Sequence, residues 1–154
     1  MRILVAAVGR GRSGSEQALF DAYRRRLSWP VTLREVEERR KLPATQLTQR
    51  EGELLLAALP KAPALFVVAL DPRGKALSSE DLARRLADWR DRGVNELAFL
   101  IGGADGHAEA VRRRADFLLS FGPMTWPHLL ARAMLAEQLY RAQQILAGHP
   151  YHRG

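Results

Sequence analysis

The chain has 154 residues, of which 47% are hydrophobic and 27% charged, as in globular proteins that bury a core of their own. It contains no cysteine, which excludes disulfides, thiolate metal sites and a cysteine nucleophile, and no apolar run approaches the roughly 20 residues of a membrane-spanning helix. The 24 lysines and arginines outnumber the 17 acidic residues, and the net charge of +7 favours a polyanionic partner, although solvated arginine-rich helix faces would give the same surplus.

Hydrophobic periodicity predicts strands alternating with helices along the first half of the chain. Residues 2–8 form an apolar, β-rich run, and we expect a strand there and not a signal peptide because Arg10 and Arg12 follow too soon. The next elements predicted are a helix over 16–27, a half-buried strand over 31–36, a helix over 46–59 and a strand buried on both faces over 64–70.

The second half continues the same alternation. Ser78, followed three residues later by Asp81, fits a capping box and predicts a helix that ends near residue 91, with a buried stripe of Leu82, Leu86 and Trp89. The remaining predicted elements are a strand over 97–101, a short helix over 108–115, a short strand over 117–120 and a last helix over 128–146. We therefore expect a single α/β domain over residues 1–154, a parallel sheet covered by helices on both faces.

A glycine pattern after the first predicted strand is typical of sites that bind a nucleotide cofactor. It has the form G-x-G-x-x-G, from Gly9, Gly11 and Gly14. Acidic residues between positions 35 and 38 lie about where a Rossmann enzyme binds ribose. The chain is too short for a full six-stranded fold with a substrate domain, and a lone match is weak. The glycines would equally serve a flexible turn from which Arg10 and Arg12 contact phosphates.

Unusual segments follow three of the predicted strands. They are LDPRGK at 70–75, IGGADG at 101–106 and SFGPMTWPH at 120–128. Ligands of open parallel sheets bind at the carboxyl ends of the strands, and glycines let backbone approach a ligand closely. Each segment alone is more often an ordinary turn, but the three together predict a binding cleft.

The strings LDPRGK, IGGADG, GPMTWPH and AEQLYRAQQILAGHPYHR resemble those of the RlmH-type enzymes. These are SPOUT-class methyltransferases that act on a pseudouridine of the helix 69 loop in large-subunit (23S) ribosomal RNA. The resemblance runs from the opening VAAVG to the closing PYHR. It implies S-adenosylmethionine as methyl donor, N3-methylpseudouridine as product and a C-terminal trefoil knot. It also implies a homodimer, in which the tail of one subunit reaches the cofactor cleft of the other.

The resemblance also implies the residues of the cofactor site. Matched position by position, they are Leu70, Gly102, Phe121, Gly122, Pro123, Met124, Thr125 and Trp126. Backbone groups would meet the polar atoms of adenosine and apolar side chains would cover its ring. The loop with Arg10 and Arg12 departs from the family pattern and is expected away from the motifs. No metal is expected, since His149 and His152 have no further ligands nearby.

Methyl transfer to a ring nitrogen requires alignment of the partners and removal of the N3 proton. Candidate catalytic residues are His128, beside the cofactor loop, and Tyr151, His152 and Arg153 in the tail. His128 would equally suit a helix N-terminus, and the tail a disordered chain end. Candidate RNA contacts are Arg10, Arg12, Arg132 and His149, although arginines of the last helix, Arg132 and Arg141, commonly pair within a helix.

The last predicted helix is apolar on more than one side, through Leu129, Leu130, Met134, Leu135, Leu139, Ile145 and Leu146. A second copy of the chain is the simplest cover, and a thick core within one chain is the alternative. We expect a cytoplasmic homodimer that acts on ribosomal RNA within the ribosome and does not contact a membrane. A non-enzymatic RNA- or ribosome-binding protein would carry the same charge, but would not need three glycine-bearing loops at one cleft.

Overall fold

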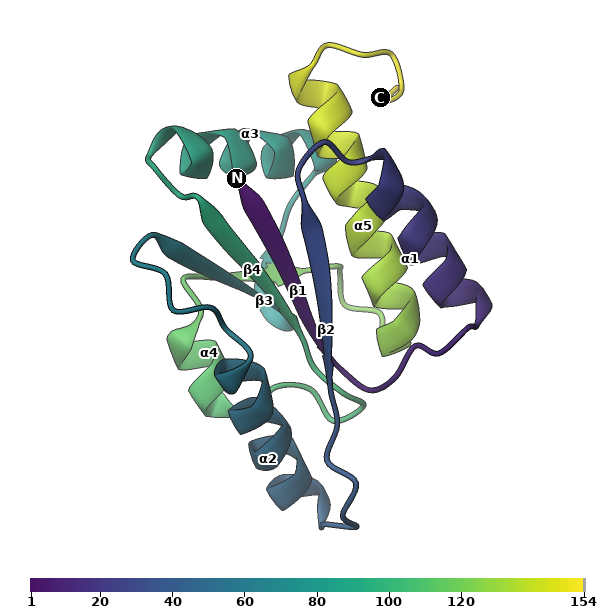
Figure 1. Cartoon of the computed structure of the whole chain (residues 1–154), viewed down its shortest axis with the longest axis vertical. Coiled ribbons are helices and arrows are strands. Elements are labelled where there is room, and N and C mark those ends of the chain that lie inside the picture. Colours follow the sequence, from purple (N-terminus) through teal and green to yellow (C-terminus); the bar gives the residue numbers. More distant parts are fainter. Residues whose placement is uncertain (154) are drawn as a thin grey trace.

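The computed structural model describes residues 1–153 and contains a five-stranded, all-parallel sheet (Figure 1). The strands are β1 (Arg2–Val8), β2 (Val31–Val36), β3 (Leu65–Ala76), β4 (Glu96–Ile101) and β5 (Phe117–Ser120), in the spatial order β2-β1-β4-β3-β5. The helices are α1 (Ser15–Arg26), α2 (Ala44–Ala57), α3 (Ser79–Asp91), α4 (Glu109–Arg114) and α5 (His128–Leu146). The predicted α/β class is confirmed.

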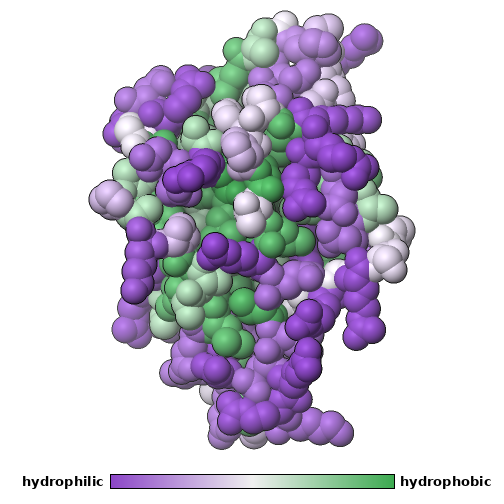
Figure 2. All heavy atoms as spheres, in the orientation of Figure 1, coloured by the Kyte–Doolittle hydropathy of each residue, from purple (hydrophilic) through white to green (hydrophobic). Residues whose placement is uncertain are grey.

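Side chains of each strand point alternately to two separate cores. Ile3, Val5 and Ala7 of β1 face the layer formed by α1, α3 and α5, whereas Leu4 and Val8 face α2 and α4. Helices thus cover both faces, and the buried stretches of the central strands, residues 3–8, 67–69 and 97–101, are apolar, as strands buried on both faces are. Figure 2 shows hydrophobic residues gathered along the middle of one view of the molecule, with hydrophilic residues to either side.

Helix α3 has the predicted start, because the Ser78 hydroxyl accepts a hydrogen bond from the Asp81 backbone N–H at 3.0 Å. Its predicted stripe of Leu82, Leu86 and Trp89 is buried. Phe20 is the buried residue of α1, whereas Leu19 is 44% exposed, because α1 is rotated so that Phe20 and Tyr23 face the core.

Strand β3 is longer than predicted, because residues 71–76 continue it instead of forming a loop. Leu70 and Lys75 both pair with Leu119 of β5, so the residues between them bulge out of the ladder. A Cβ on Gly74 would lie 2.5 Å from the backbone of Leu118, so only glycine allows this close approach. The bulge leaves Asp71 and Pro72 at the carboxyl edge of the sheet.

Helix α5 packs between α1 and α3 and is largely covered within its own chain (Figure 1). Leu135 and Leu139 are fully buried in this core. The thick-core alternative therefore holds for these two residues, and Leu139 does not belong to a surface that a second copy covers. Across residues 1–153, no helix combines the length and apolar character needed to cross a membrane.

Candidate functional site

The carboxyl ends of β3, β4 and β5 enclose a cleft of about 490 Å³. The β3 bulge, the loop after β4 and the loop between β5 and α5 form its walls. Seven of the eight predicted cofactor residues line it: Leu70, Gly102, Phe121, Pro123, Met124, Thr125 and Trp126. The eighth, Gly122, lines a neighbouring groove. The structure thus brings the three motif loops together, and their role in binding stays a prediction.

The loop from Phe121 to Pro127 is held open by its own hydrogen bonds. The Gly122 N–H donates to the Ser120 hydroxyl at 3.0 Å, and the Trp126 indole N–H donates to the Phe121 carbonyl at 3.2 Å. Gly122 has a φ of +98°, which other residues rarely adopt. These constraints leave Met124 71% exposed at the mouth of the cleft. Exposed apolar side chains beside backbone polar groups suit a ligand with a flat ring.

A buried histidine, His107, supports the loop after β4. Its Nε2 donates to the Leu100 carbonyl at 3.2 Å, and its Nδ1 has no hydrogen-bond partner among the residues that the structure describes. A Cβ on Gly102 would lie 3.0 Å from the Gly106 carbonyl oxygen and 3.2 Å from this Nδ1. His107 was not predicted as part of the site, although a histidine directly after a glycine-rich loop could have indicated it. A side chain at Gly102 would therefore require the loop after β4 to shift even before a ligand binds.

His128 is the first residue of α5 and lines the same cleft. A Cβ on Gly9 would lie 3.0 Å from its Nε2, so the loop after β1 lies against this ring. Burial, and then the charge of Arg132, lower the pKa of His128 below its usual value. His128 is therefore neutral at pH 7, as a proton acceptor must be.

The loop between β1 and α1 lies at the edge of the cleft, so the expectation that it is remote from the motifs is wrong. Arg12 is exposed with a φ of +53°, and Arg10 forms an ion pair with Glu37 at 3.3 Å. Arg132, predicted as an RNA contact or as half of a pair within the helix, is neither. It is 1% exposed and bonds to Glu35 on β2. Its guanidinium is therefore enclosed by the protein itself.

The G-x-G-x-x-G pattern has a packing explanation. Gly9 has a φ of +98° and lies against the ring of His128. A Cβ on Gly11 would collide with the Gln17 side chain and lie 3.2 Å from Arg132. Protein side chains fill the space in front of these glycines, and the sheet has five strands. The nucleotide-cofactor alternative therefore loses its support.

The chain end folds back onto α5 and is not a disordered segment. The Tyr151 hydroxyl donates to Glu137 at 3.1 Å, and its ring lies 4.8 Å from that of Tyr140. Burial and the neighbouring Tyr23 and Glu137 raise the pKa of Tyr151 to about 12, so its hydroxyl keeps its proton at neutral pH. His152 donates from Nε2 to Glu80 at 2.6 Å.

Of the other contacts of the tail and α5, the pairing of Arg141 was predicted. Arg141 donates to Nδ1 of His152 at 3.1 Å and pairs with Glu137 on its own helix at 2.7 Å, which confirms pairing within the helix for this arginine. Arg153 and His149 are exposed. Within residues 1–153, no three metal-ligating side chains gather into a site.

A family model described as "Predicted SPOUT methyltransferase" matches residues 1–152 of the chain. The chain belongs to the SPOUT methyltransferase family. Ribosomal RNA large subunit methyltransferase H of Rhodospirillum centenum is 62% identical over 153 residues, covering 99% of both chains. The protein of the same name from Paramagnetospirillum magneticum is 63% identical over 153 residues with the same coverage.

Solved structures share the fold of this SPOUT methyltransferase at low sequence identity. A probable methylase family protein from Haemophilus influenzae superposes with a TM-score of 0.57 at 10% identity, covering 99% of this chain and 70% of its own. The SpoU methyltransferase AviRb from Streptomyces viridochromogenes, solved in complex with AdoMet, has a TM-score of 0.51 at 15% identity. That match covers 94% of this chain and 58% of the AviRb chain. The trefoil knot implied by the resemblance stays a prediction.

The candidate catalytic residues of this SPOUT methyltransferase do not meet within one chain. His128 begins α5 and the tail follows its end, at the opposite pole of the helix (Figure 1). The tail folds back only as far as Glu137, which accepts the Tyr151 hydroxyl. Glu137 lies nine residues along α5 from His128, which corresponds to about 14 Å at the usual rise of an α-helix. Tyr151, His152 and Arg153 therefore do not line the cleft of their own subunit.

The buried His107 predicts how the stability of this SPOUT methyltransferase depends on pH. Burial lowers the pKa of His107 below 6.5, so the unfolded chain binds a proton more readily than the folded protein. The free energy of unfolding should be unaffected by His107 above pH 6.5 and should fall as pH drops below it, by at most about 1.4 kcal/mol per pH unit. Urea unfolding at pH 7.5 and 5.5 measures this loss.

The matched variant for this measurement is His107→Leu, which keeps an apolar group in place and removes the titration. It should lose less stability between the two pH values than the wild type. The lowered pKa of His128 acts in the same direction in both proteins and cancels in the comparison. An equal loss in the two proteins would contradict the assignment to His107.

Proposed function

We propose that this protein transfers the methyl group of S-adenosylmethionine to N3 of a pseudouridine in the helix 69 loop of 23S ribosomal RNA, with the whole chain acting as one domain. The observation that carries the proposal is the convergence of the three motif loops on one cleft at the carboxyl edge of the sheet. The names of the relatives support ribosomal RNA as the substrate class. The pseudouridine rests on the resemblance of the motif strings, and the proposed substrate places the protein in the cytoplasm.

The cleft residues fit an adenosine-containing cofactor. Leu70 and the exposed Met124 would cover the ring, while Gly102 presents backbone where any side chain would collide with Gly106. The AdoMet complex of AviRb supports this cofactor for the fold. When bound, S-adenosylmethionine supplies an electrophilic methyl group on its sulfonium. The protein must align the target nitrogen and accept its proton, and the neutral His128 at the cleft is our candidate acceptor.

Cations at the edge of the cleft would bind the RNA backbone. Arg12 is exposed on the β1–α1 loop, and Arg10 lies beside it with half of its side chain exposed. We propose both as phosphate contacts, together with His149 and Arg153 of the exposed tail. Binding should weaken as salt increases, because each phosphate contact releases counterions.

We further propose that the active form is a homodimer. The tail does not line the cleft of its own chain, so we propose that a partner's tail completes that cleft. A groove of about 530 Å³ beside α5 offers an apolar surface for the partner. Its apolar lining includes Leu19, Leu82, Leu119, Phe121, Leu130 and Met134.

Leu19→Glu is expected to convert this dimer into monomers. Leu19 is exposed on the single chain and lines the groove, so the fold tolerates a charge there, whereas an interface would bury that charge unpaired. Light scattering at micromolar protein measures the mass. Leu146→Glu is the control, because Leu146 is 38% exposed and lies outside the groove. A wild type with the mass of one chain, or a Leu19→Glu variant with the mass of two, would contradict the proposal.

The activity itself is tested with labelled S-adenosylmethionine and ribosomes that lack the modification. We expect label in 23S ribosomal RNA, and mass spectrometry of nuclease fragments should locate N3-methylpseudouridine in the helix 69 loop. Label at another nucleotide would overturn the proposed target. A protein that binds ribosomes without binding S-adenosylmethionine or transferring methyl would instead be a non-enzymatic RNA-binding protein.

A further inference from the structure

An ion pair between a buried arginine and a partly exposed glutamate joins three segments at the edge of the cleft. Arg132 of α5 pairs through Nη1 with Glu35 of β2 at 2.5 Å. Its Nη2 donates to the carbonyls of Val8 at 3.1 Å and Gly9 at 3.0 Å, at the end of β1. The same Glu35 oxygen accepts the backbone N–H of Gly11 at 2.5 Å. Two side chains that are 97 residues apart in sequence thus hold the start of the β1–α1 loop from both sides.

A charge at this position is not explained by stability. The neighbours of Arg132 on the same helix, including Ala131, Ala133 and Leu135, form an ordinary apolar core. Burying a guanidinium costs more than burying an apolar side chain of equal volume, even when the charge is paired. Nε of Arg132 also lacks a hydrogen-bond partner among the described residues, which adds to the cost. The arginine therefore serves something other than packing.

The pair links α5 to the β1–α1 loop, and both of these segments lie at the edge of the cleft. His128 lies one helical turn before Arg132 and on the same side of α5, since residues i and i+4 are neighbours on a helix. The loop fixed by Glu35 lies against the His128 ring and carries Arg12, whose positive φ requires support from its surroundings. Figure 1 shows this loop passing beside the first turn of α5.

We infer that Glu35 and Arg132 are positioning residues that hold the β1–α1 loop against the first turn of α5, so that Arg12 and His128 are presented together to the RNA. The inference rests on the proposed function and extends it, because neither residue lines the cleft. Arg132 also contributes to the lowered pKa of His128, while Glu35 and Arg10 are the other charged groups of the cluster. Replacing the pair should therefore disturb the loop and the histidine together.

The decisive variant is the double substitution Glu35→Leu with Arg132→Met, which replaces the ion pair by apolar side chains of similar volume. The variant leaves no charge of the pair buried without its partner, so the protein should fold, although the loss of the donors to the Val8 and Gly9 carbonyls should lower its melting temperature. S-adenosylmethionine affinity should stay within about threefold. The kcat/KM for ribosomes should fall about 100-fold, the scale of a misplacement near 1 Å, with most of the loss in KM. The single variant Arg132→Met should show the same loss, mostly in KM, and should be less stable than the double variant.

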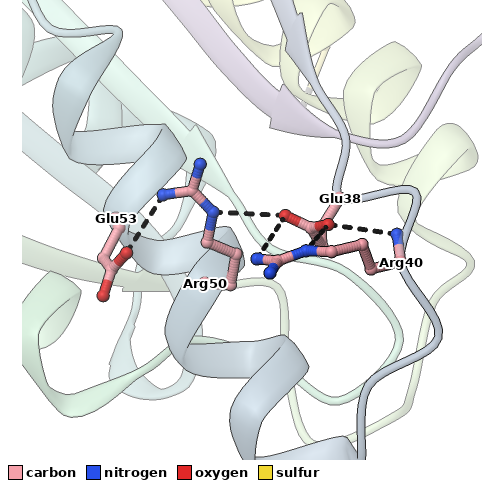
Figure 3. A network of polar contacts seen from close by, with 4 residues as sticks. All are labelled: Glu38, Arg40, Arg50 and Glu53. Atoms are coloured by element: carbon pink, nitrogen blue, oxygen red, sulfur yellow. Dashed lines mark hydrogen bonds and ion pairs between the residues drawn. The ribbon is translucent and has the colours of Figure 1, made fainter.

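Glu38→Gln is the matched control. Glu38 lies three residues after Glu35 and also pairs with arginines, Arg40 at 2.8 Å and Arg50 at 3.2 Å (Figure 3). None of these three residues lines the cleft. Its pKa is lowered to about 2 by these partners, so it is charged in the native protein as Glu35 is. Methyl transfer by Glu38→Gln should equal that of the wild type.

A readout without substrate separates this inference from the proposed function. The Gly11 amide should exchange with deuterium at least tenfold faster in the double variant, because its acceptor is gone. Wild-type protein that transfers no methyl would defeat the proposed function, while the exchange result would still decide on the loop. A folded double variant with unchanged Gly11 exchange, or with wild-type KM and kcat, would overturn the inference.

Discussion

Removing the residues after Gly148 is expected to abolish methyl transfer to ribosomal RNA while S-adenosylmethionine affinity stays at the wild-type value. None of the tail residues lines the cleft of its own chain, so the tail forms no part of the cofactor walls there. Its aromatic, imidazole and guanidinium groups suit contact with a base and phosphates. Labelled-methyl transfer and calorimetry measure the two properties separately.

The truncation will also cost some stability, because the tail is packed on the protein. It removes the hydrogen bonds of Tyr151 to Glu137 and of His152 to Glu80, each worth about 1 kcal/mol. Arg153→Ala avoids this cost, since Arg153 is exposed, and should weaken transfer most at low salt, where the counterions released by a phosphate contact contribute most to binding. Arg92→Ala, an exposed arginine before β4, is the control and should leave transfer unchanged. Full activity in the truncated protein would show that the tail has no catalytic part.

Gly102→Val is expected to reduce S-adenosylmethionine affinity at least 100-fold, which is about 2.7 kcal/mol. The first carbon of the new side chain would lie 3.0 Å from the Gly106 carbonyl oxygen and 3.2 Å from His107, so the loop after β4 must move. The branched remainder of valine would enter the space that backbone leaves for the ligand. Isothermal calorimetry measures the affinity, and circular dichroism checks that the sheet is intact.

The control for this substitution lies in the same loop. Gly106 has a φ of +80°, and a Cβ there would meet nothing within 4 Å. Asparagine tolerates such a φ better than most residues, so Gly106→Asn should fold and bind with only a several-fold change. Wild-type affinity in Gly102→Val would show that the cofactor lies elsewhere.

Elements that depend on neighbouring residues were predictable from the sequence. The periodicity of α5 gave its bounds at His128 and Leu146, and Ser78 marked the start of α3. Such signals suffice because helical periodicity and capping act over a few residues. The length of β3 was not predictable, because residues 71–76 read as a turn and become a strand only by pairing with β5, more than 40 residues later.

In the candidate site too, features set by local sequence were predictable, whereas those that depend on distant partners were not. The cleft loops were predictable because each carries glycine or apolar residues at a strand end. Burial of Arg132 was not, since its partner Glu35 is 97 residues away and the sequence offers only an arginine among alanines and leucines. The docking of Tyr151 and His152 was missed for a similar reason, because a tail after a helix-stopping glycine gives no local sign of its partners.

The strand order constrains how the protein is assembled on the translating ribosome. β4 pairs with both β1 and β3, so β3 has no neighbour in the sheet until β4 has been made. α5 is the last helix to emerge, yet it covers the apolar face that includes Val5 and Phe99. Nascent chains that stop before α5 will expose this face to chaperones and to one another. The late arrival of α5 thus delays closure of this core until residues 128–146 have been made, whereas the core beneath α2 and α4 can close before them.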